Sequence, residues 1–238
     1  MYKANGGLHT GYNTAIEHMK TELSVCVDSD DSMPCDAIER ILNIWKECKS
    51  DNLAGIVGLD YTDDGKLVGK KLPESSEINA ASLLCIPGMG DKKYVIRNDL
   101  LRQIAPMPVF EGEKNFNPHY FVIRLSKDYR FRPVNQCFCL VEYQENGMSA
   151  NIYKQYLNSP KSFAELRREI LKLKELTLRY RFKTAVHYVS SSLMAKDMQF
   201  IMKSPEKLLV ILALPLGLGL NWYIHFKNRK IMLNKRLF

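Results

Sequence analysis

The chain has 238 residues, of which 46% are hydrophobic and 25% are charged, so it is long and apolar enough to fold around a sizeable core. This composition excludes a disordered protein, and the 13 glycines and 10 prolines show no collagen-like or repeat bias. The net charge of +8 is uneven: residues 161–238 hold 16 Lys/Arg and 5 Asp/Glu (net +11), whereas residues 1–160 hold 18 and 21 (net −3). The basic third therefore indicates contact with an anionic surface.

The six cysteines are scattered, without a CxxC pair and without a histidine at the spacing of a zinc site. No secretory signal opens the sequence, so we expect a reduced, cytoplasmic setting. Cys137 and Cys139 lie two residues apart in a stretch typical of a strand. Their side chains are therefore expected on one face, packed as core thiols.

The first third of the chain predicts alternating helices and strands. We expect a helix over 10–20, a strand over 23–27 that ends at an acidic run, and an amphipathic helix over 36–49. A second strand over 54–59 ends before the turn at 63–65. The order strand, helix, strand predicts an α/β layer. Apolar residues at the spacing i, i+3, i+4 and i+7 predict that the helix over 36–49 buries one stripe, made of Ile38, Ile41, Leu42 and Trp45.

Further strands and helices are expected downstream. The segment 61–92 is rich in Gly, Pro and Ser and predicts long loops of the kind that shape a site on a rigid scaffold. The predicted strands cover 94–96 and 136–141, and the predicted helices cover 99–104 and 116–125.

After Pro160 the pattern becomes helical. One amphipathic helix carries Phe163, Leu166, Ile170 and Leu173, and residues 179–195 predict another. Residues 208–226 then form a run of 19 residues without a formally charged side chain. Basic residues flank the run on both sides: Lys203 and Lys207 before it, and Lys227, Arg229 and Lys230 after it.

The acidic run Asp28-Ser29-Asp30-Asp31 follows an apolar strand. Carboxylates two residues apart, on a chain that turns as it leaves a sheet, can face one point. Their oxygens suit Mg²⁺ or Mn²⁺, which completes its coordination shell with phosphate oxygens. The alternative is a solvated acidic turn, or a cap of the helix that begins near Asp36, because Asp favours both places.

The residues around this run carry a family resemblance. The segment Asn5-Gly6-Gly7-Leu8-His9-Thr10-Gly11-Tyr12-Asn13-Thr14-Ala15, followed by a strand into Val27-Asp28-Ser29-Asp30-Asp31, resembles in order and spacing the signature of family 2 glycosyltransferases. The resemblance covers residues 4–227. Three downstream segments resemble further motifs of that family: Gly90-Asp91-Lys92 with Tyr94, Ile96 and Arg97; Phe110-Glu111-Gly112-Glu113-Lys114; and Val141-Glu142-Tyr143 with Asn146-Gly147-Met148-Ser149.

The resemblance implies an α/β fold with a GT-A-like (Rossmann-like) mixed sheet flanked by helices. It implies transfer of a sugar, with inversion, from a nucleoside diphosphate donor to a glycan or lipid-linked acceptor, with a UDP-sugar as the foremost donor. Asp28 and Asp30 would bind Mn²⁺ or Mg²⁺ and, through it, the donor diphosphate, where the metal acts as a Lewis acid.

The same resemblance implies roles for two further groups of residues. Glu113 is implied as the general base that takes the acceptor proton, with Glu111 in reserve; the alternative is that both are acids of a surface turn. The residues implied near the nucleotide are Asn5, Gly6, Gly7 and Asn13, whose alternative is a simple helix entry. His9 is expected to be a structural residue.

Family members carry a strand and two further βα units before this signature, whereas Met1 lies four residues before Asn5. We therefore expect an N-terminally truncated GT-A domain over 1–160, a helical extension over 161–205 and an apolar, basic-flanked tail over 206–238. Weak or no activity is expected from this chain by itself. The competing function is a non-catalytic, truncated remnant of such an enzyme that retains membrane association.

The apolar run at 208–226 reaches about 28 Å as a helix, just short of a comfortable bilayer crossing. We expect it to lie as a hairpin or a helix on the cytoplasmic face of the cell membrane, attracted to anionic lipid by its basic flanks, with a true span as runner-up and a buried core helix as the third reading. Nucleic-acid binding is not expected, because no aromatic stacking platform interleaves with the basic residues.

Overall fold

The computed structural model describes residues 3–142 and 152–234, with side chains of the last helix described as far as residue 229. The chain divides into two compact units. Met1–Asn13, Met107–Tyr120 and Asn146–Phe238 form one, which we call the helical unit, and Thr14–Pro106 and Phe121–Glu145 form the other, which we call the sheet unit. The predicted motif residues Tyr143 and Asn146 to Ser149 lie outside the described residues. The three-part division at 160 and 205 stays a prediction.

The sheet unit is built on a four-stranded mixed sheet with the strand order β1-β3-β2-β4. β3 is antiparallel to both of its neighbours, whereas β2 and β4 are parallel. The strands β1, β2 and β4 therefore run in one direction and end at the same edge. The strands are β1 (Leu23–Val25), β2 (Leu53–Thr62), β3 (Lys92–Arg97) and β4 (Arg130–Val141), which confirms the predicted mixed α/β class.

Helix α2 (Ala37–Cys48) packs against this sheet. Ile41 and Trp45 are buried as predicted, but Ile38 and Leu42 are 51% and 47% exposed, so the predicted stripe is wrong for these two residues. The buried stripe is instead centred on Ala37, Ile41 and Trp45, at i, i+4 and i+8, so the helical period is right and its phase is not. The core under α2 is formed by Ile41, Trp45, Leu53, Ile56, Val95, Val134 and Phe138.

Two elements of the sheet unit differ from expectation. β4 begins at Arg130, six residues before the predicted start, and includes Pro133. An edge strand tolerates a proline because its outer N–H groups need no partner. The predicted loop 61–92 contains the 3₁₀ helix η1 (Ala80–Cys85), capped by the Asn79 side chain, which accepts a hydrogen bond from Ala81 N–H. The other predicted helices are found as α1 (Leu8–His18), α3 (Asn98–Ile104) and α4 (His119–Leu125).

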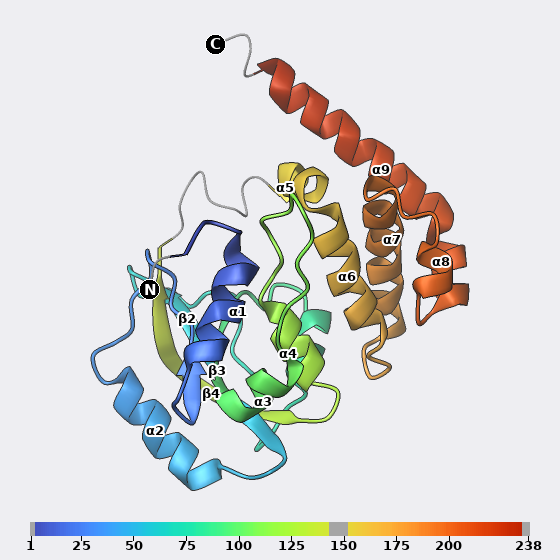
Figure 1. The fold of residues 1–238 in the computed structure, drawn as a ribbon. Helices are drawn as coiled ribbons and strands as arrows, with labels where there is room; N and C mark the ends of the chain where they lie inside the picture. The colour runs from blue at the N-terminus through green and yellow to red at the C-terminus, as the bar shows by residue number, and fades with distance from the viewer. Residues whose placement is uncertain (1–2, 143–151, 235–238) are drawn as a thin grey trace. The chain divides into compact units, whose positions relative to one another are not determined.

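Between residues 152 and 234, the regular secondary structure of the helical unit is all α-helical. The two amphipathic helices predicted after Pro160 are confirmed, and the apolar run lies inside one long helix, α9, that packs on α7 (Figure 1). The buried contacts join Leu171, Ala185, Tyr188, Val189, Phe200, Val210 and Ala213. The helices are α5 (Ile152–Asn158), α6 (Pro160–Leu171), α7 (Leu178–Met194), α8 (Phe200–Lys203) and α9 (Lys207–Asn234).

Candidate functional site

The acidic run forms a loop at the edge where β1, β2 and β4 end. We call residues 28–32 the aspartate loop. Asp31 N–H donates to the Asp28 carbonyl at 3.0 Å, and Ser32 exchanges two backbone hydrogen bonds with Leu140, at 2.9 and 2.8 Å. Since Leu140 belongs to β4, the loop that leaves β1 at one side of the sheet is attached to the strand at the other side. Ligands of open α/β sheets bind at this carboxyl edge.

The three aspartates of the loop have different environments. Asp31 is directed into the unit: its Oδ2 lies 3.4 Å from Lys93 Nζ, and the two side chains are only 9% and 12% exposed. Cys139 Sγ, on β4, lies 3.8 Å from the same oxygen. Asp28 and Asp30 are exposed. One acid therefore anchors the loop, and the two acids predicted to bind a metal are accessible.

A buried ionic group lies beside this anchor, at the end of β2 and the start of β3. Asp60 is 3% exposed, and its Oδ1 has no hydrogen-bond partner among the described residues. Burial raises the pKa of Asp60 to about 6, and Lys93 opposes this shift. For Lys93, burial favours the neutral form, but Asp60, Cys139 and Asp31 together outweigh burial and raise its pKa. Lys93 thus lies near two carboxylates, and Asp31 is the one that forms the ion pair with it.

The adjacent Lys92 serves a structural purpose at the same edge. Its Nζ donates to the carbonyl oxygens of Val68, Met89 and Asp91 at 3.0, 2.6 and 3.0 Å. These bonds hold the loop after β2 against the loop before β3. The Lys92 ammonium group therefore fixes these two loops at the edge of the sheet and is not available to a ligand.

In the helical unit, the segment before α1 packs directly on the segment 110–117. Leu8 N–H donates to the Lys114 carbonyl at 3.1 Å. Gly7 has φ +98°, and a Cβ at this position would lie 2.3 Å from the Lys114 carbonyl oxygen, so only glycine fits. Two segments that the resemblance assigns to substrate binding and catalysis are therefore in contact within one unit.

The residues predicted to contact the nucleotide lie around this junction. Asn5 and Gly6 are exposed, and Asn5 Oδ1 accepts a hydrogen bond from Gly7 N–H at 3.1 Å. Asn13 instead clamps the backbone of Met107: its Nδ2 donates to the Met107 carbonyl at 2.9 Å, and its Oδ1 accepts from Met107 N–H at 2.8 Å. Both ends of the Asn13 amide thus have a structural partner, and its contact with a nucleotide stays a prediction.

The two acids of the segment 110–114 are unlike each other. Glu113 is only 7% exposed, and its carboxylate receives three hydrogen bonds from the first turn of α6. The donors are Lys161 N–H at 2.9 Å, Ser162 N–H at 2.7 Å and the Ser162 hydroxyl at 2.6 Å. Negative charge at a helix N-terminus is favoured by the helix dipole. The alternative reading of Glu113 as an acid of a surface turn is therefore wrong, because the side chain is buried as a helix cap.

Glu111, in contrast, is exposed in the turn closed by the Glu113 N–H to Phe110 carbonyl bond. Asp28 and Asp30 belong to the sheet unit, whereas Glu111 and Glu113 belong to the helical unit. The general-base role of either glutamate and its proximity to the aspartates stay predictions.

His9 lies in an apolar setting beside these residues. It is fully buried, its ring centroid is 6.2 Å from that of Phe116, and neither ring nitrogen has a partner among the described residues. Burial lowers the pKa of His9, opposed by the nearby Glu113 carboxylate. The imidazole is therefore neutral near pH 7.

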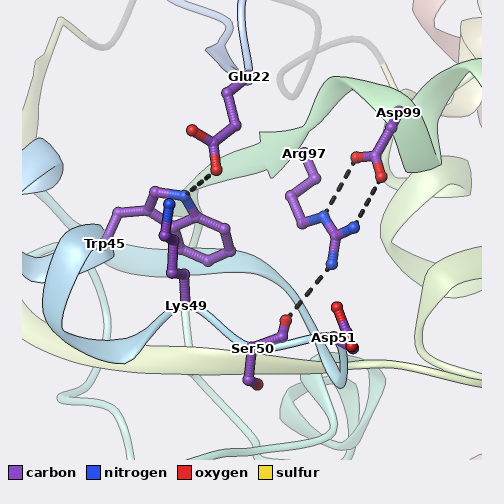
Figure 2. A pocket seen from close by; sticks show the side chains of 7 residues that line it. All are labelled: Glu22, Trp45, Lys49, Ser50, Asp51, Arg97 and Asp99. Atoms are coloured by element: carbon purple, nitrogen blue, oxygen red, sulfur yellow. Dashed lines mark hydrogen bonds and ion pairs between the residues drawn. The ribbon is translucent and has the colours of Figure 1, made fainter.

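A cavity of about 400 Å³ opens at the opposite edge of the sheet, where β1 and β2 begin (Figure 2). Its polar groups have internal partners: Trp45 Nε1 donates to Glu22 at 2.8 Å, and Arg97 binds both Asp99 oxygens at 3.1 and 2.7 Å. Arg97 also donates to the carbonyls of Ser50 and Leu53. The residues predicted to bind the metal or the nucleotide, or to act as the base, do not line the cavity, and its Arg97 holds the chain segments around it.

The aspartate loop fits a hard divalent cation only in part. No group of three His, Cys, Asp or Glu side chains close enough to hold a metal occurs within residues 3–142 and 152–229. Asp28 and Asp30 would therefore supply at most two carboxylates. Mg²⁺ is commonly held by one or two carboxylates together with substrate phosphates, so the donor set suits a cation that arrives with a diphosphate.

Comparisons with known proteins do not assign a family. No family model and no curated protein matches the chain. Among solved structures, residues 1–349 of S. aureus TarS are 14% identical, with a TM-score of 0.47 over 97% of this chain and 73% of that chain. The same TarS segment in complex with UDP-GlcNAc gives 14% identity and a TM-score of 0.49 over 97% and 74% of the two chains. At this identity and with these scores, the likeness carries no argument about activity.

Proposed function

We propose that this chain is a family 2-type glycosyltransferase, which moves a sugar from a nucleoside diphosphate donor, foremost a UDP-sugar, to a glycan or lipid-linked acceptor. The observation that carries the proposal is the aspartate loop. It lies at the carboxyl edge of the parallel strands, its third acid is anchored by Lys93, and Asp28 and Asp30 are left exposed. A solvated acidic turn would need no buried anchor, because its acids are satisfied by water.

Asp28 and Asp30 would hold the divalent cation that accompanies the donor. When bound, such a cation would neutralise negative charge on the diphosphate. The backbone around Asn5 and Gly6, exposed at the entry to α1, is the proposed contact for the nucleotide.

The chemistry proposed is a single displacement with inversion. A glutamate accepts the proton of the acceptor hydroxyl while the acceptor oxygen bonds to the anomeric carbon and the bond from that carbon to the diphosphate breaks. Glu113 has about one acceptor position left after its three hydrogen bonds, whereas both oxygens of the exposed Glu111 are accessible. Glu113 remains the foremost base by the resemblance, and Glu111 has the better access to a substrate.

The test is calorimetric titration of UDP into the full chain with and without Mn²⁺. Asp30→Asn should weaken the Mn²⁺-dependent binding by at least about tenfold, because one cation ligand is lost. Asp63→Asn is the matched control, since Asp63 is also an exposed acid in a turn of the sheet unit, and it should bind as the parent does.

Three outcomes separate the competing functions. Mn²⁺-dependent binding with release of UDP from a UDP-sugar supports the transferase. The same binding without turnover on any acceptor supports the non-catalytic remnant. An unmodified chain that binds no UDP with Mn²⁺, or an Asp30→Asn chain that binds as well as the parent, contradicts the assignment of the loop.

A further inference from the structure

Helix α9 exposes one continuous apolar face. At 100° per residue, the exposed positions fall within about half of the helix circumference and recur over the whole stretch from 208 to 226. We call this face the α9 stripe. Its large apolar members are Leu208, Ile211, Leu212, Leu216, Leu218, Trp222, Tyr223 and Phe226, which are between 39% and 72% exposed. Soluble monomers rarely leave an apolar surface of this extent uncovered.

The opposite face of α9 is already occupied by its own unit. Val210, Ala213 and Ile224 are buried, and a Cβ on Gly217 would lie 2.5 Å from Val189 of α7. Polar contacts fix the same face: Asn221 Nδ2 donates to the Ser190 carbonyl at 3.1 Å. Asn228 Nδ2 donates to the Tyr153 carbonyl at 2.9 Å. The stripe is therefore the free half of a helix whose other half is firmly packed.

Basic residues flank the stripe at both ends, and the acid nearest to it in the sequence, Glu206, is paired with Arg181. Residues 208–226 have no charged side chain, whereas Lys207 precedes them and Lys227 and Arg229 follow. At the C-terminal end, the rings of Trp222 and Phe226 stack at 5.7 Å, and Lys227 Nζ lies 5.7 Å from the Tyr223 ring centre. Aromatic rings beside basic residues are typical of side chains at the level of lipid headgroups.

We propose that the α9 stripe docks the helical unit on an anionic lipid surface, with α9 lying in the plane of the interface. This inference does not depend on the proposed sugar transfer. A second copy of the chain would bring together two basic helices from regions of net charge +11, which repel, whereas anionic lipid complements them. A core helix is excluded by exposure, because only 22% of the apolar window of Lys207–Arg229 is buried.

Two features favour lying on the bilayer over crossing it, although Lys207–Arg229 is long and apolar enough to cross. First, a crossing would separate α9 from α7 and expose Val189, Ala185 and the other residues buried between them. Second, Pro215 lies inside the helix and is exposed. Since proline has no N–H, the Ile211 carbonyl lacks its helical partner. Water and headgroups can solvate this carbonyl at the interface, whereas the hydrocarbon core cannot.

The test is flotation of the full chain with vesicles of phosphatidylcholine containing phosphatidylglycerol, compared with vesicles of phosphatidylcholine only. The parent chain should float with the anionic vesicles. Leu212→Glu and Leu218→Glu should each weaken this binding about tenfold or more. Leu178→Glu is the matched control, because Leu178 is 68% exposed at the start of α7 and lies outside the stripe. It should float as the parent does, and circular dichroism should show all three variants folded.

Further experiments test whether the partner is anionic lipid and whether α9 lies on the bilayer or crosses it. Lys227→Gln and Arg229→Gln should each lower the affinity about fivefold on anionic vesicles only. Bound protein should be released by alkaline carbonate, which leaves membrane-spanning helices in place. The proposal is overturned if the parent does not bind anionic vesicles, if Leu178→Glu and Leu212→Glu behave alike, if carbonate releases nothing, or if sedimentation shows a dimer that Leu212→Glu dissociates.

Discussion

Glu113 in the helical unit and Asp60 in the sheet unit are both buried carboxylates, but their surroundings differ. Glu113 receives three hydrogen bonds from the start of α6, at 2.6 to 2.9 Å. Asp60 has an oxygen without a partner among the described residues, and burial raises its pKa to about 6. The Glu113 carboxylate is therefore supplied with hydrogen-bond donors, whereas the charged form of Asp60 is destabilised by desolvation.

The contrast indicates which buried acids hold the fold and which serve another purpose. A carboxylate with three donors stabilises the native state, so its burial needs no functional explanation. A carboxylate that lacks a donor opposes folding, and such groups cluster where a protein binds or reacts. Asp60 lies beside Lys93, the anchor of the aspartate loop, and in the same unit as the proposed cation ligands.

The largest change in the free energy of unfolding is expected from Glu113→Ala. Removal of the carboxylate leaves Lys161 N–H and Ser162 N–H without acceptors, so the free energy of unfolding should fall by about 3 kcal/mol. Glu113→Gln, which keeps one oxygen, should cost less. Urea denaturation followed by circular dichroism measures both changes. A Glu113→Ala chain as stable as the parent would show that the cap contributes little.

Asp60→Asn should raise the free energy of unfolding, whereas Glu113→Ala lowers it. The folded-state pKa of Asp60 is raised to about 6, so this group favours folding below the unfolded pKa of 3.8 and loses that contribution as pH rises to about 6. At about pH 7 the ionised, buried Asp60 costs about 3 kcal/mol. The variant should recover about 2 kcal/mol of this, because Lys93 loses one neighbouring charge but keeps Asp31.

The pH dependence is the control for Asp60→Asn. At about pH 4 the gain should fall below about 1 kcal/mol, because the parent is then mostly protonated at this site. Urea titrations at both pH values measure the difference. An equal gain at both would mean that the ionisation of Asp60 is not its cause.

A smaller change in the free energy of unfolding tests whether Asp60 and Lys93 interact energetically. Lys93→Met should cost less stability in the Asp60→Asn background than in the parent, with a coupling of about 1 kcal/mol in a double-mutant cycle. Additive changes would place the two groups in independent environments.

The smallest effect is expected at Glu111. This side chain is exposed, so Glu111→Gln should change the free energy of unfolding by less than about 0.5 kcal/mol. A larger loss in urea denaturation would mean that Glu111, like Glu113, holds the fold. Loss of sugar transfer without loss of stability would favour Glu111 as the base.

Much of the fold could be predicted because local patterns determine it. The strand before the aspartates and the helices after Pro160 were evident from β-prone runs and helical periodicity. The exposure of Ile38 and Leu42 in α2 was missed because periodicity gives the spacing of a buried stripe but does not fix which side of the helix faces the sheet. The early start of β4 was missed because Pro133 is tolerated only on an edge strand, and sequence does not show which strand is at the edge.

The candidate site was predicted only in its exposed part. Asp28 and Asp30 were identifiable because their spacing is local, whereas Lys93 and Asp60 join them through strand pairing across more than thirty residues of chain. A signal for Asp60 existed, since it is an acid at the end of a long apolar strand. The burial of Glu113 had no signal, because the helix it caps begins 47 residues later.

The aspartate loop is fixed at both ends: it leaves β1 at one end, and Ser32 is hydrogen-bonded to Leu140 of β4 at the other. A loop of five residues with fixed ends has few conformations to lose when a cation and its diphosphate bind, so little conformational entropy opposes their binding. Hydrogen exchange at the hydrogen-bonded amides of Asp31 and Ser32 should accordingly be slow before any ligand is added, and should change little afterwards.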